Sequence, residues 1–413
     1  MSSGGLPVQP GPIGPSAEVE AHKVSPLTLF RVFFVVGLTS FGMAILQNIR
    51  SVTARRGWLS REEIDEGLGL VQLYPGAIGV DLVAYIGYRM RRIRGALAAT
   101  AGFATPALLL MLGLSWAYVE FGASGNMAQV VVGLSAIVVG VVASITLDFA
   151  GQHARGRLEA VLAVGAFGVG MAGLNLLWAV LGALVIGAFA LRPKSEDRAE
   201  SRSLDVRISG RRLALSLVPA VVVAAGAIVA VLAPGALATL TAGMAKTGSV
   251  AFGNGSTILP VLRQDAVEVH RWLTPEAFAV GVGFGQITPG PYLMTAAFIG
   301  FNVAGWVGGV LAAVAIFAPS VAMTMVAAEV YPYLRRLTAV RGAIRGIMAA
   351  FVGLLGTVVF SLSQQILDIP AALVLAAATL ALVRAFKWNL LVVFGAGLAA
   401  WAVYLLINGP VGT

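Results

Sequence analysis

Most of this chain consists of apolar stretches that are long enough to cross a lipid bilayer and carry few charges. Of its 413 residues, 58% are hydrophobic and 11% are charged, whereas a soluble domain carries about 25% charged residues to solvate its surface. A helix spans the hydrocarbon core with about 20 apolar residues. The sequence therefore predicts an all-α polytopic membrane protein with thirteen transmembrane segments, near 26–48, 64–88, 95–118, 127–149, 158–173, 174–192, 212–233, 236–262, 276–301, 306–330, 340–363, 369–385 and 388–408.

Composition excludes several kinds of site. The chain has no cysteine and three histidines, which argues against disulfides, thiolate nucleophiles and most metal sites, and we expect no cofactor. A membrane enzyme would need converging acids, histidines or a nucleophile, and few such groups lie in the apolar segments. The formal charge of +9, from 28 Lys and Arg against 19 Asp and Glu, is attributed to cytoplasmic loops rather than nucleic-acid binding.

The two halves of the chain are related by an internal repeat. Identities in register at an offset of 214 join Trp58-Leu59 to Trp272-Leu273, Gln72 to Gln286, and Pro75-Gly76 to Pro289-Gly290, and an offset of 213 joins Gly95 to Gly308 and Pro106 to Pro319. Residues 1–25, rich in Pro, Gly and Ser, are expected to be a disordered tail without the order of a signal peptide. The predicted domains are a first repeat at 26–192, a cytoplasmic loop and connector helix at 193–235, and a second repeat at 236–408.

The membrane orientation of the second repeat depends on how many segments cross. If all thirteen cross, the two six-helix repeats are inverted, the N-terminus is cytoplasmic and the C-terminus is external. If 64–88 and 276–301 are instead re-entrant hairpins broken at Pro-Gly, the repeats are parallel. The distribution of Lys and Arg favours the inverted arrangement, although it leaves Arg50, Arg55, Arg56 and Arg61 outside.

The Pro-Gly pairs are the main candidates for a binding site. Inverted-repeat transporters bind substrate near mid-membrane, where corresponding Gly/Pro-interrupted helices meet. Proline removes an amide donor and glycine tolerates non-helical torsions, so both segments are expected to break. A half-helix that starts after such a break points free amides and about half a positive charge at its surroundings, which suits an anion; a simple proline kink is the alternative.

Three further features are candidates. The glycine-rich run Phe252-Gly253-Asn254-Gly255 aligns with Phe41-Gly42-Met43-Ala44 and permits either substrate contact or close helix packing. Lys246 carries a charge into an apolar segment, where ionisable groups are usually functional. Asp81 follows the first break, has no acidic counterpart in the second half, and is a candidate for coupling transport to protons.

With these motifs the chain resembles the chromate ion transporter family in its long two-domain form. The resemblance rests on FGMA and FGNG at 41–44 and 252–255, on Trp-Leu-Ser/Thr at 58–60 and 272–274, on Gln-x-x-Pro-Gly at 72–76 and 286–290, and on Ile-Gly-Tyr/Phe at 86–88 and 299–301. It implies a transporter, not an enzyme, that exports chromate across the inner cell membrane, driven by the membrane potential or a proton gradient, with sulfate as a competitor.

The candidate substrate-binding residues are Phe41, Gly42, Gln72, Pro75, Gly76, Lys246, Gly253, Asn254, Gly255, Gln286, Thr288, Pro289 and Gly290. The second half follows the family pattern, whereas the first has FGMA in place of a Gly-Gly-Pro-like turn, Pro-Gly-Ala in place of Pro-Gly-Pro, and Asp81 where a neutral polar residue is usual. Another small inorganic or organic anion therefore remains the alternative substrate. The expected partners are that anion and the lipid bilayer, with a second copy of the chain as a further candidate and no nucleic acid.

Overall fold

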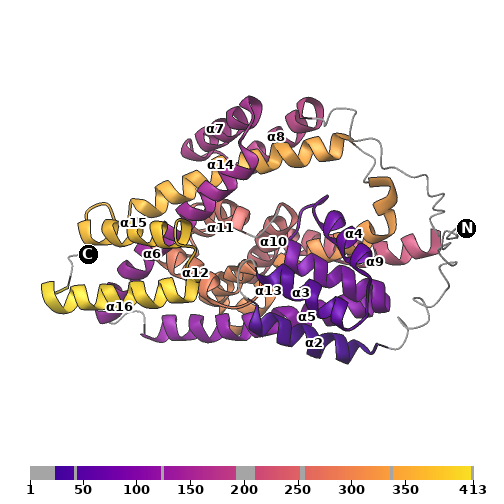
Figure 1. Ribbon diagram of the computed structural model, residues 1–413, viewed down its shortest axis with the longest axis horizontal. Coiled ribbons are helices and arrows are strands. Elements are labelled where there is room, and N and C mark those ends of the chain that lie inside the picture. The colour runs from indigo at the N-terminus through magenta and orange to yellow at the C-terminus, as the bar shows by residue number, and fades with distance from the viewer. Residues whose placement is uncertain are drawn as a thin grey trace, which may run out of the picture.

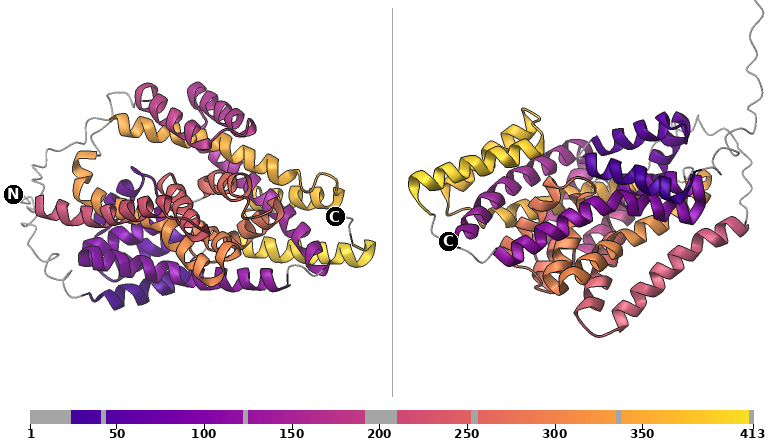
Figure 2. Two further views of the ribbon diagram at one scale, coloured as in Figure 1. Left: turned by 180° about the vertical axis from the view of Figure 1, so that it is seen from behind. Right: turned by 90° about the horizontal axis from the view of Figure 1, so that it is seen from below.

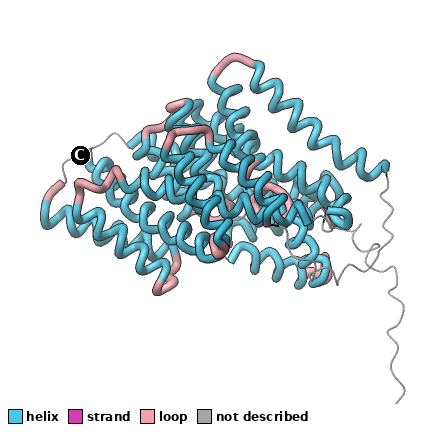
Figure 3. Tube along the Cα trace, turned by 90° about the horizontal axis from the view of Figure 1, so that it is seen from above, coloured by secondary structure: helices cyan, strands magenta, loops and turns pink. Residues whose placement is uncertain are grey.

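A computed structural model describes residues 24–40, 44–121, 125–191, 210–251, 256–334 and 338–410, which are helical throughout apart from short turns (Figure 3). The predicted all-α class is confirmed for this part of the chain. The helices of the first half are α2 (Pro26–Thr39), α3 (Ala44–Arg55), α4 (Arg61–Val71), α5 (Ile78–Phe121), α6 (Gly125–His153), α7 (Arg157–Met171) and α8 (Leu176–Ala190).

A connector, α9 (Gly210–Leu232), precedes the second half. Its helical elements follow the same order as those of the first half. They are α10 (Ala236–Ser249), η2 (Ser256–Ile258), α11 (Leu259–Arg263), η3 (Gln264–Val269), α12 (Pro275–Ile287), η4 (Tyr292–Met294), α13 (Thr295–Leu334), α14 (Thr338–Ser363), α15 (Pro370–Arg384) and α16 (Leu390–Asn408).

The repeated Trp-Leu-Ser/Thr motif sets where α4 and α12 begin. The Ser60 hydroxyl accepts a hydrogen bond from the Glu63 amide, and the Glu63 carboxylate accepts one from the Ser60 amide, which makes a capping box. In the second half the Thr274 hydroxyl caps α12, and Pro275 occupies the first turn, where a missing amide costs no hydrogen bond. The repeat seen in the sequence is therefore a repeat of helix starts.

The two longest helices, α5 and α13, each double back at a sharp corner. Arg91 and Arg92 have φ/ψ of −145°/29° and 52°/−144°, and Ala304 and Gly305 have nearly the same torsions, −150°/34° and 59°/−148°. A Cβ on Gly87 would clash with the Gly95 carbonyl, and one on Gly300 with that of Gly308. Residues eight apart in a straight helix would be about 12 Å apart, so each helix is a hairpin with arms 78–90 and 93–121, or 295–303 and 306–334.

The segments that contain the Pro-Gly pairs also fold back. A Cβ on Gly67 of α4 would overlap the Tyr85 ring in arm 78–90, and one on Gly281 of α12 would overlap the Phe298 ring in arm 295–303. Arg89 and Glu63 form an ion pair of 2.7 Å between the outer ends of α4 and arm 78–90. The expectation of thirteen crossings is not confirmed, because 64–88 and 276–301 are hairpins in this structure.

The segment 26–48 turns back as well. Trp58, which follows α3, packs on Phe33 in the middle of α2 with ring centroids 6.0 Å apart. The amide of Asn48 in α3 donates to the hydroxyl of Ser40, at the end of α2, at 3.0 Å. The first half therefore contains two consecutive folded-back segments, which the sequence reading did not foresee.

The long arms of the two halves run in opposite directions. Near the corner of α5, Glu329 accepts hydrogen bonds from Tyr88 at 2.8 Å and Arg92 at 2.5 Å, although Glu329 lies at the far end of α13. Conversely, Tyr118 at the far end of α5 packs on Phe298 near the corner of α13, with centroids 5.3 Å apart. Arm 93–121 therefore lies antiparallel to arm 306–334.

These contacts define a basic end of the molecule, at which the α5 corner with Arg89, Arg91, Arg92 and Arg94, the start of α4 and the end of α13 lie together. The start of α2 belongs to this end because Arg91 donates to the Val24 carbonyl at 2.7 Å.

Arg50 of α3 pairs with Asp65 of α4. The first-half cluster Arg50, Arg55, Arg56 and Arg61 therefore lies at the same end of the molecule as Arg89, whereas the sequence analysis expected this cluster on the external side.

The remaining helices surround the two hairpin units (Figures 1 and 2). In Figure 1, α7 and α8 pack along α14, and α15 and α16 lie beside α6, while α9 lies along the other side of the molecule in Figure 2. Six helices in the described part of the chain are long and apolar enough to cross a membrane. Only 11% of the apolar stretch of α9, within Leu213–Leu232, is buried inside the protein, as expected for a helix that faces lipid.

Candidate functional site

Both Pro-Gly breaks border a single cavity of about 590 Å³. The first break contributes Gln72, Tyr74 and residues 77–80 to its wall, and the second contributes residues 291–293. The cavity also reaches the end of α6 and the start of α14, both at the basic end. Two segments that are about 214 positions apart in the sequence therefore face the same space.

The first break exposes the start of a helix to this cavity. Helix α4 ends at Gln72, and the first hydrogen bond of the following helix is from the Asp81 amide to the Ala77 carbonyl at 2.9 Å. The amides of Ile78, Gly79 and Val80 precede that bond and have no acceptor in their own helix. These residues line the cavity, so their donors lie beside it.

The second break has the same construction with different torsions. Thr288 ends α12 in an extended conformation, Gly290 has φ of 100°, and the Met294 amide makes the first turn bond, to the Pro291 carbonyl at 3.1 Å. A φ of 100° is disfavoured for residues with a Cβ, which explains glycine at this position. The amides of Tyr292 and Leu293 then begin the next helical element at the cavity wall.

Each break is seated on the long arm of the other half. A Cβ on Gly76 would clash with the Asp81 carboxyl group and press on Ser320 of α13, and one on Gly290 would meet the Ala107 side chain of α5 at 3.0 Å. Ser320 and Ala107 are 213 positions apart, so the two contact positions are related by the repeat. The glycines of the Pro-Gly pairs are therefore required by close approach between the halves.

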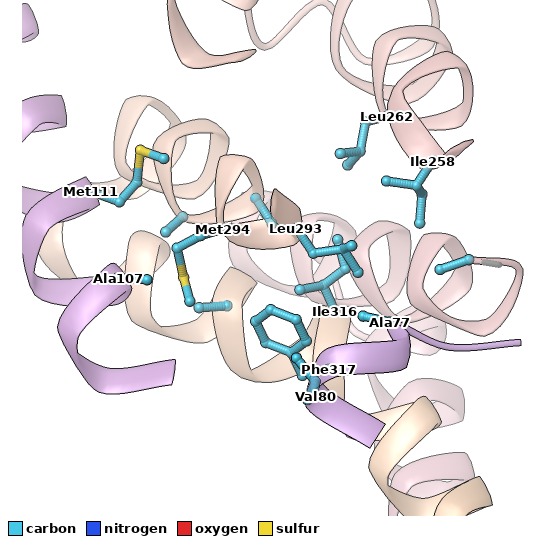
Figure 4. Close-up of a cluster of buried hydrophobic side chains, with 14 of the residues drawn as sticks. Ala77, Val80, Ala107, Met111, Ile258, Leu262, Leu293, Met294, Ile316 and Phe317 are labelled. Carbon is cyan, nitrogen blue, oxygen red and sulfur yellow. The ribbon is translucent and has the colours of Figure 1, made fainter. Parts of the chain in front are cut away.

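Part of the cavity wall belongs to an apolar cluster (Figure 4). Figure 4 draws Ala77 and Val80 of the first break, Leu293 and Met294 of the second, and Ile316 and Phe317 of α13 in one group. Their side chains are at most 5% exposed. The cavity wall therefore combines apolar residues at the breaks with polar residues of α6 and α14.

At the basic end the cavity is lined by charged and polar side chains. Asp148, Gln152 and His153 of α6 lie there with Arg345 of α14. Asp148 is paired with Arg384 at 2.7 Å, whereas Arg345 has no ion pair among the described residues and is exposed. An uncompensated cation at the mouth of a cavity raises the local concentration of anions.

The structure brings together only part of the predicted site. Gln72 lines the cavity, and Pro75, Gly76, Pro289 and Gly290 form the two breaks. Gln286 and Thr288 are buried, with 5% and 7% exposure, and neither lines the cavity. Phe41, Gly42, Gly253, Asn254 and Gly255 lie outside the described residues.

Lys246 is held by an acid rather than directed into the cavity. Its ammonium group donates to Asp265 Oδ1 at 2.7 Å, and the Thr247 hydroxyl donates to Oδ2 of the same residue at 3.2 Å. Asp265 is 2% exposed. The ion pair joins α10 to η3, so the charge of Lys246 has a structural role in this fold.

Two cavity residues were missed by sequence reasoning. Arg345 looked like an ordinary loop cation because it lies close to the start of an apolar segment. Tyr74 lies inside the Gln-x-x-Pro-Gly motif, and its hydroxyl is 2.7 Å from that of Thr324 in the other half. The position of Tyr74 between two motif residues was the available signal, whereas nothing in the sequence marked Arg345.

A profile of known chromate transporters matches residues 27–188 and 238–401, one match in each repeat. The chain belongs to the chromate transporter family. A chromate transport protein of Cupriavidus metallidurans is 31% identical over 97% of this chain and 99% of its own length. One of Pseudomonas aeruginosa is 26% identical over 91% of this chain and 92% of its own, and an uncharacterized transporter of Methanocaldococcus jannaschii is 27% identical over 81% and 83%. No solved structure matches this chain.

Membership of the chromate transporter family identifies this chain as a multi-pass membrane transporter for an ion and not an enzyme. The two profile matches agree with the two structural repeats. Each match contains one Pro-Gly break, so each family unit contributes one helix start to the shared cavity.

Proposed function

We propose that this chain is a secondary active transporter that exports chromate or a related oxyanion across the inner cell membrane, driven by the membrane potential or a proton gradient. The observation that carries the proposal is that two helix starts, one from each repeat, face one cavity. Free amides at helix N-termini bind anions, and broken helices of this kind form the substrate sites of inverted-repeat transporters. The choice of chromate as the substrate follows from the names of two relatives, which are chromate transport proteins.

In this proposal the substrate is held mainly by backbone donors. The amides of residues 78–80 and of Tyr292 and Leu293 would approach the oxyanion from two sides, with Gln72 and Tyr74 as side-chain donors. A tetrahedral oxyanion offers acceptors in all directions, which suits donors from separate segments. Phe41, Gly42, Gly253, Asn254 and Gly255 remain proposed contacts, as do Gln286, Thr288 and Lys246.

We also propose that the two repeats are inverted in the membrane, with the basic end in the cytoplasm. Support comes from the antiparallel long arms and from the excess of Lys and Arg that cytoplasmic ends carry. Re-entrance and inversion are compatible because 26–48 and 64–88 both fold back. Four crossings in the first half plus α9 give an odd number, so the second half starts on the opposite side.

This orientation places the mouth of the cavity on the cytoplasmic side, where an exported anion would load. Arg345 would attract the anion, and the helix starts would hold it against the apolar cluster. Movement of one repeat against the other would then open the opposite side. Each break packs against the long arm of the other half, so a relative shift of the halves would change both of these contacts together.

The direct test is uptake of radiolabelled chromate by everted membrane vesicles that contain the protein. Energised vesicles should accumulate chromate, and an ionophore that collapses the membrane potential and proton gradient should abolish accumulation. Excess sulfate should compete with chromate if the site recognises oxyanions by their shape. Energised vesicles that exclude chromate, sulfate and organic anions alike would refute the proposal.

A different small anion is the second candidate, and the first break gives it a specific basis. Ala77 stands where the second break has Pro291, so the first break keeps a backbone donor that proline lacks. An additional donor alters which anion fits best. Strong competition by an organic anion and weak competition by chromate would favour this candidate.

A further inference from the structure

Asp81 is a buried carboxyl group that the proposed binding site does not use. It lies in the first turn of arm 78–90, directly behind the residues that line the cavity, and has 0% exposure. Neither carboxyl oxygen has a hydrogen-bond partner among the described residues. An ionised carboxylate in such a place would lack both water and a compensating donor.

The hydroxyl groups around Asp81 are better placed to accept a hydrogen bond from it than to donate one to it. Ser320 and Thr324 of α13 face the carboxyl group, but the Ser320 hydroxyl donates to the Phe317 carbonyl at 3.2 Å and the Thr324 hydroxyl to the Ser320 carbonyl at 2.8 Å. Their remaining lone pairs are acceptors. The surroundings therefore suit a protonated carboxylic acid, which donates, better than a carboxylate, which only accepts.

No cation compensates Asp81 in the described part of the chain. Tyr74 is a titratable residue close enough to interact with Asp81 electrostatically, and its hydroxyl is 2.7 Å from that of Thr324. The facing residues of α13 are uncharged. A negative charge on Asp81 would thus act on its surroundings without a partner to neutralise it.

The position of Asp81 couples its charge to an anion at the first break. Its amide closes the first turn of the helix whose preceding amides, those of residues 78–80, face the cavity. An ionised Asp81 would put a negative charge within one helical turn of the anion, and like charges at that distance repel strongly in a water-poor site. Protonation of Asp81 removes this repulsion.

We propose that Asp81 must hold a proton for the anion to bind, so that the transporter moves each oxyanion together with one proton. This inference rests on the proposed anion site at the Pro-Gly breaks. The proton enters from the aqueous side that loads the anion and leaves on the side that releases it. A divalent oxyanion then crosses with a net charge of one negative unit, so the membrane potential still drives it outward.

The repeat limits the coupling to one proton at this pair of positions. The residue 214 positions after Asp81 is Thr295, which is 2% exposed and donates its hydroxyl to the Tyr292 carbonyl at 3.2 Å. A threonine cannot exchange a proton in this range of pH. The two breaks therefore have a similar construction and different proton chemistry.

The test uses the purified full-length protein in proteoliposomes, with wild type, Asp81→Asn and, as a matched control, Asp65→Asn, which removes an exposed acid at the basic end. Wild type should lose affinity for chromate by about tenfold for each pH unit above the titration of Asp81, as linkage of one proton requires. Chromate influx should acidify the lumen in wild type and in Asp65→Asn, because each anion carries one proton in with it, and alkalisation of the lumen would contradict the proposal. Asp81→Asn should bind chromate independently of pH and move it without protons.

Infrared spectroscopy gives a readout that does not depend on the substrate. Wild type and Asp65→Asn should show the C=O band of a protonated carboxylic acid at neutral pH in the absence of any anion, and Asp81→Asn should lack it. Absence of that band in wild type would overturn the inference. If the band is present but no anion is transported, the proposed function fails instead, and chromate transport that is equally independent of pH in wild type and Asp81→Asn would overturn the coupling alone.

Discussion

The amide of Gly290, in the break of the second half, donates a hydrogen bond of 3.0 Å to the carbonyl of Ser40, at the end of α2 in the first half. Ser40 is the C-cap residue of α2, at an end where helix carbonyls lack intrahelical donors, and Gly290 lies just after the end of α12. This bond joins the two repeats at the level of the cavity. The site is therefore formed by both halves and belongs to neither alone.

Replacing Gly290 with alanine should strain this junction. The residue has φ of 100° and its Cβ would meet that of Ala107, so Gly290→Ala should lower stability by about 1–3 kcal/mol and abolish chromate transport. Thermal unfolding in detergent and vesicle uptake would measure the two effects. Gly113→Ala is the matched control because Gly113 lies in an ordinary helix and its Cβ would meet nothing within 4 Å. Normal uptake by Gly290→Ala would show that the junction is not needed.

The re-entrant arrangement can be tested with single cysteines, since the chain has none of its own. Arg61→Cys and Arg94→Cys should react with an impermeant thiol reagent from the same side of the membrane, because the Glu63–Arg89 ion pair holds their segments together. Glu120→Cys, at the far end of α5, should react from the opposite side. Labelling of Arg61→Cys and Arg94→Cys from opposite sides would restore the model in which 64–88 crosses.

A structural role and a binding role for Lys246 make different predictions. Lys246→Ala leaves the buried Asp265 without its ion pair, which should destabilise the protein by about 1–3 kcal/mol. The double variant Lys246→Ala/Asp265→Ala should recover much of that stability, since contacting residues are not additive. Recovery of uptake along with stability is expected if the pair is structural. A stable double variant that cannot transport would instead place Lys246 in the binding site.

Arg345 should determine how fast anions enter the cavity. Arg345→Gln removes the unpaired cation at the mouth, so the initial uptake rate at low chromate should fall by about tenfold at low ionic strength and by less at high ionic strength. Uptake measured across a series of salt concentrations would show this. Arg94→Gln, at the basic end but not in the cavity wall, should leave the salt dependence unchanged. An unaltered rate in Arg345→Gln would mean that entry does not depend on this charge.

The sequence was sufficient to predict those features that depend on local composition. Long apolar segments predicted the helices, and the Pro-Gly pairs marked both breaks because proline and glycine act on their own backbone. The path of the chain was harder to predict, because 64–88 has the same length and apolar character whether it crosses or folds back. What decides between them is the contact of Gly67 with Tyr85, which joins two positions 18 residues apart.

The candidate site was predicted unevenly for the same reason. Residues whose role follows from backbone conformation, such as Gly76 and Gly290, could be identified from the motif. Lys246 could not be assigned, because its partner Asp265 lies on another helix and nothing in the spacing of the two residues connects them. Arg345 was missed because its importance comes from the cavity beside it and not from its sequence neighbours.

The reciprocal seating of the breaks has a consequence for how such a protein can arise and mature. Gly76 needs the second half's Ser320 beneath it, and Gly290 needs the first half's Ala107. During synthesis, the first half must wait in the bilayer with its broken segment unsupported until the second half is inserted. Two separately encoded halves would face the same constraint, and neither would survive long without the other, so their genes would be expected to remain adjacent and to be expressed in equal amounts.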